Sequence, residues 1–387
     1  MPDPSVTLRV LHVVPSFYPA TYFGGPIYSV FALCNALAAR DDVELRVLTT
    51  DSAGPSRTQR LDVPESPIRY SPGYDVHYFR RQFGVAFAPS MFAAMPHLVR
   101  WADVIHLTAV YSPPTIPVLA LSRALRKPIV WSPRGSFQKW QSSTHLRLKA
   151  AWNLISRALV APSSTIVHAT SEEEAATVDS CVPGLRVRVI PNGVNIPVHS
   201  STREWMPNGV MRLLFLGRLH PIKGIENLLR AVTLVQRKAI TLRICGTGDA
   251  SYIESLRALT RVLGLLDRVQ FTGAIAPDSK GMVFETTDLC IVPSFSESFG
   301  IVVAESLAHG VPVVASRGTP WSELQPRRCG LWVNNSPTSL ATAISNLKRE
   351  ELATMGSRGR IWMKESFDWS TIAARMAALY RELATGN

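Results

Sequence analysis

The segment LCIVPSFSESFGIVVAESLAHGVPVVAS, residues 289–316, places a strand, a loop, a helix and a second strand in immediate succession. Its apolar residues predict a buried strand over 289–293, a helix over 301–308 and another strand over 311–315. This order of elements is typical of an α/β fold built on a parallel sheet. The segment therefore indicates the fold class that the rest of the chain has to match.

Two glutamates in this segment are candidates for ligand binding. Glu297 lies in the loop and Glu305 in the predicted helix. Their spacing is about two turns at ~3.6 residues per turn, so both carboxylates can face one side. The backbone N–H groups of residues 298–301, at the start of the helix, form a ready anion site. One segment can thus supply a carboxylate for sugar hydroxyls, amides for a phosphate and a second carboxylate for a ribose diol. The alternative is a pair of solvent-facing glutamates on an amphipathic helix.

Length and composition indicate the number of domains and the class of protein. A chain of 387 residues exceeds one typical core, so two domains are expected, and its 46% of hydrophobic residues can fill buried parallel strands. We expect no transmembrane helix, because no run of about 18 uncharged apolar residues occurs. The start MPDPSVTLRV lacks the layout of a signal peptide. Five scattered cysteines without a CxxC pair predict buried thiols in a reducing compartment.

The net charge of +12 predicts an anionic partner. Between Asp103 and Glu172 the chain has no acidic residue, yet it carries eight basic residues: Arg123, Arg126, Lys127, Arg134, Lys139, Arg147, Lys149 and Arg157. Several tryptophans and a phenylalanine lie among them. Such a stretch suits an anionic membrane surface or nucleic acid, and its plain alternative is a solvated helical face. Because no zinc-finger, RNP or heptad pattern is present, we expect no nucleic-acid partner.

Strand and helix signals alternate along most of the chain. Strands are predicted over residues 6–14, 43–50, 104–107, 128–131, 165–169, 187–190, 212–216, 241–245 and 269–272, in addition to the two of the opening segment. Helices are predicted between them, for example over 27–40, 225–236 and 252–263. The polar, turn-rich residues 191–209 are the expected interdomain connection. The pattern predicts two doubly wound α/β halves that face each other across a ligand-binding cleft.

Three loops have the composition of phosphate sites. FGGP, residues 23–26, places a double glycine before a helix, although a plain turn explains it as well. GRLHPIKG, residues 217–224, holds Arg218 and Lys223 around a turn after a strand, bracketed by Gly217 and Gly224. Two fixed cations can neutralise a diphosphate leaving group, and the alternative is a solvent-facing loop. CGTGD, residues 245–249, lacks a full GxGxxG and so gives little support to a nicotinamide site.

Taken in order, GRLHPIKG, GTGD, FTG at residues 271–273 and the E-x7-E of the opening segment resemble the retaining glycosyltransferases of family 4. VVPSFYPATYFGGP near the N-terminus and PNGVN at 191–195 are similar to the family too. The resemblance implies the GT-B architecture, with two Rossmann-like domains and a last helix that crosses back onto the first. It implies an acceptor-binding domain over residues 1–193, a nucleotide-sugar domain over 194–369 and the crossing helix over 370–387.

The resemblance also assigns residue roles. Arg218 and Lys223 would hold the donor diphosphate as it leaves, and Glu297 would contact the donor sugar hydroxyls. Glu305 would bind the ribose. The remaining donor-binding positions would be Gly25, Gly217, Phe299, Gly300 and Ile301. Transfer would retain the anomeric configuration. It would need no metal or other cofactor, and no Asp-x-Asp is present to hold a metal.

The N-terminal half departs from many relatives. In DVIHLTAVYSP the position of a second histidine is taken by Thr108, and His106 is then either a packing residue or a base. Relatives with a histidine after the next strand would align it near Arg134, which either binds an acceptor phosphate or caps local structure. SPRGSF, residues 132–137, resembles enzymes that build exopolysaccharide, capsule or O-antigen units. This resemblance implies a hexosyl transfer to a polyprenyl-diphosphate-linked saccharide, by a cytoplasmic protein attached peripherally to the inner face of the plasma membrane. Residues 80–83 and the apolar residues 85–95 are expected to add to the membrane surface, and the alternative is an ordinary loop and helix.

Two alternatives stay open at this point. One is another GT-B enzyme, such as a sugar-nucleotide epimerase or a phosphorylase, and the other is a non-catalytic scaffold with the same fold. Epimerases lack this E-x7-E spacing, and a pyridoxal-binding lysine context is not apparent. The presence of Arg218, Lys223, Glu297 and Glu305 together argues against a decayed site.

Overall fold

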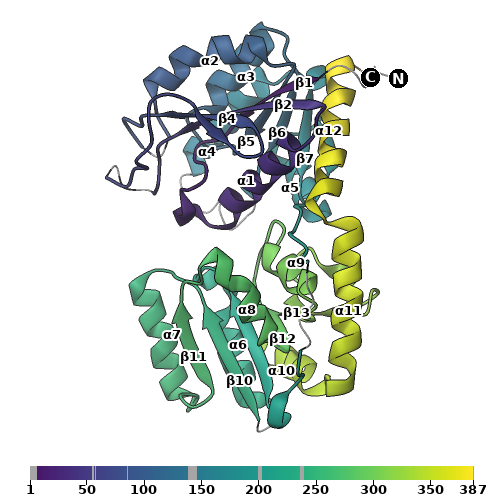
Figure 1. Cartoon of the computed structure of the whole chain (residues 1–387). Helices are drawn as coiled ribbons and strands as arrows, with labels where there is room; N and C mark the ends of the chain where they lie inside the picture. The colour runs from purple at the N-terminus through teal and green to yellow at the C-terminus, as the bar shows by residue number, and fades with distance from the viewer. Residues whose placement is uncertain are drawn as a thin grey trace. The chain divides into compact units, whose positions relative to one another are not determined.

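The computed structural model describes residues 7–386 except 55, 57, 85, 138–145, 199–202 and 236–238. The chain divides into two compact units: Met1–Gly193 with Trp369–Asn387, and Val194–Asp368. Each unit consists of one sheet with helices on both faces (Figure 1). No helix among the described residues is both long enough and apolar enough to cross a bilayer.

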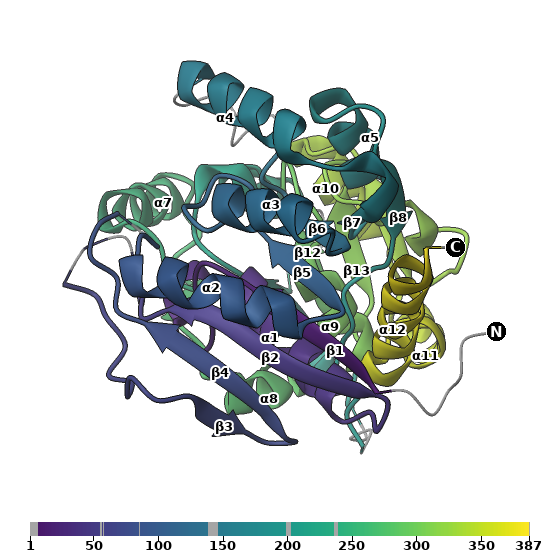
Figure 2. The same ribbon diagram turned by 90° about the horizontal axis from the view of Figure 1, so that it is seen from above.

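The sheet of the first unit has eight strands in the order β3-β4-β2-β1-β5-β6-β7-β8 among the described residues. The strands are β1 (Leu8–Val13), β2 (Val43–Thr50), β3 (Ile68–Tyr70), β4 (Tyr74–Phe79), β5 (Val104–Thr108), β6 (Ile129–Ser132), β7 (Thr165–Ala169) and β8 (Arg186–Val189). All neighbours pair in parallel except β3 and β4, which form an antiparallel hairpin at the sheet edge (Figure 2). The inner strands β5, β6 and β7 are buried throughout, as strands covered on both faces must be.

Two helix layers cover this sheet. One hydrophobic core joins α1 (Gly25–Ala38) and α12 (Trp369–Thr385) to one face. The other core involves α2 (Pro89–Trp101), α3 (Thr115–Ala124), α4 (Leu146–Leu159) and α5 (Glu172–Cys181). The last helix α12 therefore packs beside α1 and belongs to the first unit (Figure 1). Its inward stripe, which includes Ile372, Met376 and Tyr380, is fully buried, and this apolar burial is what holds it in place.

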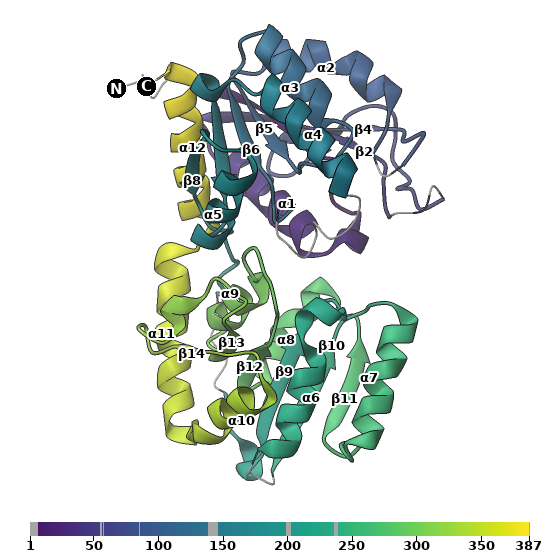
Figure 3. The ribbon, with the colours of Figure 1, turned by 180° about the vertical axis from the view of Figure 1, so that it is seen from behind.

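The second unit holds a parallel six-stranded sheet in the order β11-β10-β9-β12-β13-β14 among the described residues. Its strands are β9 (Met211–Leu216), β10 (Ile240–Cys245), β11 (Val269–Gly273), β12 (Leu289–Val292), β13 (Val313–Ser316) and β14 (Gly330–Val333). One face carries α6 (Ile225–Leu234), α7 (Ala250–Val262) and α10 (Pro337–Asn346), with α6 and α10 in contact (Figure 3). The other face carries α8 (Lys280–Glu285), α9 (Ile301–Ala308) and α11 (Arg349–Ser366).

The predicted α/β fold with doubly wound sheets is confirmed, and its predicted strands are present within two residues at each end. The strand expected over 311–315 begins at Val313, because Pro312 has no N–H to give to the ladder. The structure adds β3, β4 and β14, which we did not predict.

Candidate functional site

The loop after β9 and the loop after β10 lie directly against each other in the second unit. Leu219 N donates to Thr247 O (2.7 Å), and the two loops form a short parallel bridge. A Cβ on Gly246 would lie 1.8 Å from Gly217 O, and one on Gly248 would lie 2.0 Å from Leu219 O. The glycines of CGTGD are therefore required for close backbone packing, which holds the Arg218 loop in position.

Lys223 and Glu297 meet at the edge where β9 and β12 end. Lys223 closes the 3₁₀ turn Pro221–Lys223, and its Nζ forms an ion pair with Glu297 Oε1. Ser294 Oγ donates to the same carboxylate oxygen (2.8 Å), and Glu297 N donates to Gly318 O (2.9 Å). These contacts fix the carboxylate in one orientation. The Lys223 and Glu297 side chains keep 20% and 15% of their surface exposed, so a ligand can reach both.

Gly224 shows why the turn after Lys223 ends in glycine. Its φ is +63°, and a Cβ there would lie 2.2 Å from Pro293 O. The same carbonyl accepts from Asn335 Nδ2 (2.6 Å), while Phe295 N donates to Ile222 O (2.7 Å). The Lys223 turn is thus bonded directly to the chain leaving β12, which carries Glu297.

The start of α9 is an open helix N-terminus. Its cap residue Gly300 has a φ of +74°, and no side chain caps the helix there. Trp321 Nε1 donates to Phe299 O (2.5 Å), which fixes the loop before the helix. The first amides of a helix have no acceptor in a preceding turn, so the N–H of Ile301 and its neighbours can bind an anion.

Glu305 lies one turn further along α9 and has one free carboxylate oxygen. Its Oε1 pairs with Lys280 Nζ (2.7 Å) at the start of α8. Its Oε2 is buried without a hydrogen-bond partner among the described residues. A buried acceptor without a donor is costly, and a ligand hydroxyl would satisfy it. Sequence reasoning did not assign Lys280 a role, and nothing local in the sequence indicates that it reaches Glu305.

Arg218 lies exposed between Gly217 and Leu219 on the same loop. Burial, followed by the charges of Arg218 and Lys223, lowers the pKa of His220, which caps the 3₁₀ turn through Nδ1. The loop is therefore a cationic surface next to a neutral imidazole. Such a surface can neutralise a diphosphate.

In the first unit, His106 lies in a buried chain of polar groups. Because the carbonyl of Ile190 can only accept, His168 Nε2 donates to it (2.8 Å) and His168 Nδ1 accepts from Ser132 Oγ (2.7 Å). Ser132 Oγ then accepts from His106 Nε2 (2.6 Å), and His106 Nδ1 accepts from Tyr380 Oη (2.6 Å). Both nitrogens of His106 are thus occupied, and this geometry favours the packing interpretation.

The histidines of this cluster are held neutral. His12 stacks on His106 with ring centroids 4.1 Å apart. Burial lowers the pKa of His12 and of His168 to about 3 and that of His106 well below its usual value, with the charge of Arg134 adding to each shift. The cluster is consequently a set of neutral hydrogen-bonding groups.

Gly25 starts α1 in the first unit, after Gly24 at a φ of +70°. Arg134 follows β6, close to the histidine cluster.

Arg81 is fully buried, and its guanidinium donates to the carbonyls of Gly54 (2.8 Å), Ser56 (2.7 Å) and Gln59 (2.9 Å). The expected contribution of segment 80–95 to a membrane surface is therefore wrong for Arg81, which binds backbone oxygens. It is also wrong for the inward face of α2, where Met91 and Met95 are core residues.

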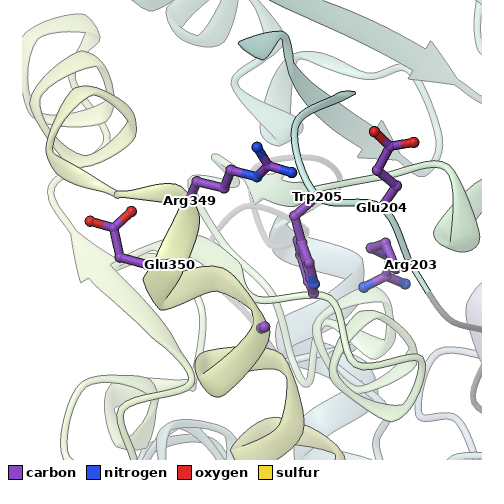
Figure 4. A pocket seen from close by; sticks show the side chains of 6 residues that line it. Arg203, Glu204, Trp205, Arg349 and Glu350 are labelled. Atoms are coloured by element: carbon purple, nitrogen blue, oxygen red, sulfur yellow. The ribbon is translucent and has the colours of Figure 1, made fainter. Parts of the chain in front are cut away.

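A pocket of about 500 Å³ opens on the second unit between segment 203–205 and the start of α11 (Figure 4). Arg203, Glu204, Trp205, Arg349 and Glu350 line it. Arg203 donates to Gly310 O (2.8 Å) and His309 O (3.1 Å) and stacks over Trp205, so it serves the packing of the unit. None of the predicted site residues lines this pocket.

Two doubly wound α/β units with cationic and acidic side chains on the loops at the strand ends are the architecture of the GT-B glycosyltransferases. Residues 23–197 match the profile described as Glycosyltransferase Family 4, and residues 211–350 match that described as Glycosyl transferases group 1. The chain belongs to glycosyltransferase family 4.

Among solved structures, sucrose-phosphate synthase from Thermosynechococcus elongatus superposes with a TM-score of 0.76 at 22% identity, covering 98% of this chain and all of that one. HepE from Anabaena, in complex with UDP-glucose, superposes with a TM-score of 0.71 at 20% identity, covering 97% of this chain and all of that one. Both likenesses concern the fold.

Curated relatives match in sequence over shorter spans. The GDP-mannose-dependent alpha-(1-6)-phosphatidylinositol monomannoside mannosyltransferase of Mycobacterium tuberculosis is 33% identical over 178 residues, 43% of this chain and 46% of that protein. The D-inositol 3-phosphate glycosyltransferase of Acidothermus cellulolyticus is 33% identical over 215 residues, 51% of this chain and 48% of that protein. The chain spans about half the length of the curated relatives it matches.

Proposed function

We propose that this protein transfers a hexosyl group from a nucleoside-diphosphate sugar to an acceptor with retention of the anomeric configuration. The observation that carries the proposal is the ion pair between Lys223 and Glu297, beside the open N-terminus of α9. It places a fixed cation, a fixed carboxylate and free amides within one group of loops. A nucleotide sugar needs these three kinds of group at its diphosphate and its sugar.

In this proposal Lys223 and Arg218 neutralise the charge that develops on the departing diphosphate. Preorganised cations act most strongly where charge grows in the transition state. Glu297 accepts hydrogen bonds from the donor sugar hydroxyls, and the amides of Phe299, Gly300 and Ile301 bind sugar or phosphate oxygens. The departing phosphate helps to deprotonate the acceptor. Because the two cations neutralise the diphosphate, the proposed transfer needs no metal.

Glu305 is proposed to bind the ribose. Its buried Oε2 offers an acceptor that the described residues leave without a donor, and a ribose hydroxyl supplies one. The relatives support this class of donor, since the mannosyltransferase is GDP-mannose-dependent and HepE was crystallised with UDP-glucose. The roles of Gly25 and Gly217 stay predictions from the family resemblance.

For the acceptor we propose a polyprenyl-diphosphate-linked saccharide used in cell-surface polysaccharide synthesis, reached at the inner face of the plasma membrane. The support lies in α4, where Leu148, Leu154 and Ile155 expose 70%, 69% and 47% of their surface. Arg147 and Arg157 lie exposed on the same helix, within a stretch of chain free of acidic residues. Apolar side chains bordered by arginines are suited to an anionic bilayer surface.

The proposal is tested by following donor turnover in EDTA by proton NMR, with the UDP, GDP and ADP esters of glucose and mannose. We expect one ester to release its nucleoside diphosphate and the sugar to appear first in the anomeric form of the donor. Release of the opposite anomer would contradict retention. Turnover to an epimerised nucleotide sugar would favour the epimerase alternative, and binding without turnover, with or without acceptor, would favour the scaffold.

A further inference from the structure

Arg134 is a partly exposed cation whose hydrogen-bonding capacity is not filled. It follows β6, and its Nη1 donates to Asn192 Oδ1. Its Nε is buried and has no hydrogen-bond partner among the described residues. Nor does Arg134 form an ion pair within the described part of the chain. A buried N–H donor without an acceptor is costly, and an anion would satisfy it.

The nearby carboxylate does not supply that anion. Glu174 contributes to the charge around Arg134, but its oxygens accept from Gly135 N (2.5 Å), Thr170 N (2.7 Å) and Thr170 Oγ1 (2.7 Å). These bonds anchor the loop that carries Arg134. Between Asp103 and Glu172 the sequence has no acidic side chain, so the residues adjacent to Arg134 in the chain offer it no carboxylate.

The other neighbours of Arg134 are neutral. His12, His106 and His168 have lowered pKa values, for which burial is the main cause and the charge of Arg134 a further one. Burial also lowers the pKa of Arg134. The negative charge near Arg134 is thus that of Glu174, whose oxygens already accept hydrogen bonds from Gly135 and Thr170.

The backbone holds Arg134 in an uncommon conformation. Its φ is +52°, and Gly135 follows with a φ of +79°. A left-handed conformation costs a residue with a side chain of the order of 1–3 kcal/mol and persists where the surroundings impose it. In this conformation Gly135 N donates to Glu174 Oε1, and the guanidinium of Arg134 donates to Asn192 Oδ1.

We propose that Arg134, together with Asn192, binds an oxyanion carried by a substrate of the transferase, at the carboxyl edge of the first unit's sheet. This inference rests on the proposed function and adds a second anion to it, apart from the donor diphosphate held by Arg218 and Lys223. Two sources offer this chemistry: a carboxylate on the donor sugar, as in a uronate, and the diphosphate of a lipid-linked acceptor. A guanidinium suits either one because it donates two parallel hydrogen bonds.

The test measures binding by calorimetry on the full chain, with Arg134→Gln and Arg134→Lys. In one arm the glucose and glucuronate esters of the nucleoside diphosphate that the wild type binds are compared. In the other arm the protein is saturated with that nucleoside diphosphate, and a short-chain prenyl-diphosphate-linked sugar is compared with its alkyl glycoside. Arg126→Gln is the matched control, since Arg126 also has a φ of +52° but is exposed.

We expect Arg134→Gln to weaken binding of the anionic member of one pair about 10- to 100-fold and to leave the uncharged member and the nucleoside diphosphate unchanged. The affinity of Arg134→Lys for the anionic member is expected to lie between those of Arg134→Gln and wild type. A selective loss of glucuronate-ester binding would identify the donor sugar as the source of the oxyanion. A selective loss of prenyl-diphosphate-sugar binding would identify the acceptor.

An equal loss for charged and uncharged members, or no loss in either pair, would overturn the inference and leave Arg134 a structural residue. If Arg134→Gln fails to fold, Arg134→Lys decides, because it keeps the charge but loses the paired donors. Failure of the proposed function is distinguishable, since the wild type would then bind no nucleoside diphosphate at all.

Discussion

Lys223 and Glu297 form an ion pair across 74 positions of sequence, joining the turn after β9 to the loop before α9. Neither side chain is fully buried, and Ser294 Oγ holds the shared carboxylate oxygen from a second direction. The pair is therefore fixed in place and open to a ligand. This combination is what a preorganised site for charge development requires.

The first prediction concerns this pair. Lys223→Ala and Glu297→Gln are expected to lower kcat about 100-fold or more, because each removes a preorganised group that acts on developing charge or on the sugar. Steady-state transfer or donor turnover measures the change, and urea unfolding checks that the variants fold. Arg261→Ala, which removes an exposed ion pair to Glu254 (2.6 Å), is the control and should keep full activity. Near-normal turnover by a folded Lys223→Ala would remove Lys223 from the site.

The second prediction concerns Glu305. Glu305→Ala should raise the Kd for the nucleoside diphosphate about tenfold, because a ribose hydroxyl loses its charged acceptor. Calorimetry with the nucleoside diphosphate and with its free base separates a ribose effect from a general one. Glu323→Ala, which removes an exposed carboxylate paired with Arg327, should leave both affinities unchanged. An unchanged Kd in Glu305→Ala would show that Oε2 does not face the nucleotide.

The third prediction is a loss of stability at acid pH through the histidine cluster. Burial lowers the pKa of His12 and His168 to about 3, below the usual value near 6.5. The unfolded chain thus binds protons that the folded chain refuses, so the stability is full above about pH 6.5 and falls as the pH drops toward the folded values. Each histidine should cost about 1 kcal/mol between pH 7 and pH 5.5.

Urea unfolding at several pH values measures this slope. His168→Gln should be less stable at neutral pH and show a shallower dependence on pH. His97→Gln, on the exposed side of α2, should reproduce the wild-type slope. A slope in His168→Gln as steep as that of the wild type would show that His168 is not held neutral.

The fourth prediction concerns α4. Leu154→Glu should reduce binding to phosphatidylglycerol-containing vesicles at least about tenfold, since it places a negative charge on the apolar face. Leu266→Glu is the matched control, because Leu266 exposes 67% of its surface against 69% for Leu154 and lies in the second unit. Vesicle co-sedimentation at low and high salt measures both. Equal losses in the two variants, or binding that ignores lipid charge, would contradict a docking role for α4.

Sequence reasoning found the parallel strands because strands buried on both faces are continuous apolar runs, as in β5 and β12. It missed the hairpin of β3 and β4, whose burial alternates along an edge of the sheet. It also missed β14, which begins with a glycine and is only partly buried after it, unlike the fully buried β12.

The candidate site was also predictable from the sequence only in part. The loop and helix carrying Glu297 and Glu305 were predictable because strand, turn glycine and helix start follow one another locally. Lys223 was predicted from its own loop, but its pairing with Glu297 and that of Lys280 with Glu305 were not, since both are tertiary contacts. Arg81 and Arg134 look alike as basic residues in a loop. Only the folded chain shows that Arg81 is fully buried, with Nη1 and Nη2 bonded to backbone carbonyls, whereas Arg134 is partly exposed and its Nη1 donates to the side chain of Asn192.

The most direct test of the central claim is the thermal stability of wild type and Lys223→Ala in EDTA, with saturating UDP, GDP or ADP. A ligand raises the unfolding temperature of the state it binds. The account predicts a clear rise for wild type with one of the three nucleotides, unaffected by EDTA, and a much smaller rise for Lys223→Ala. No rise with any of them, or an equal rise in both proteins, would contradict a nucleotide-sugar site built around Lys223 and Glu297.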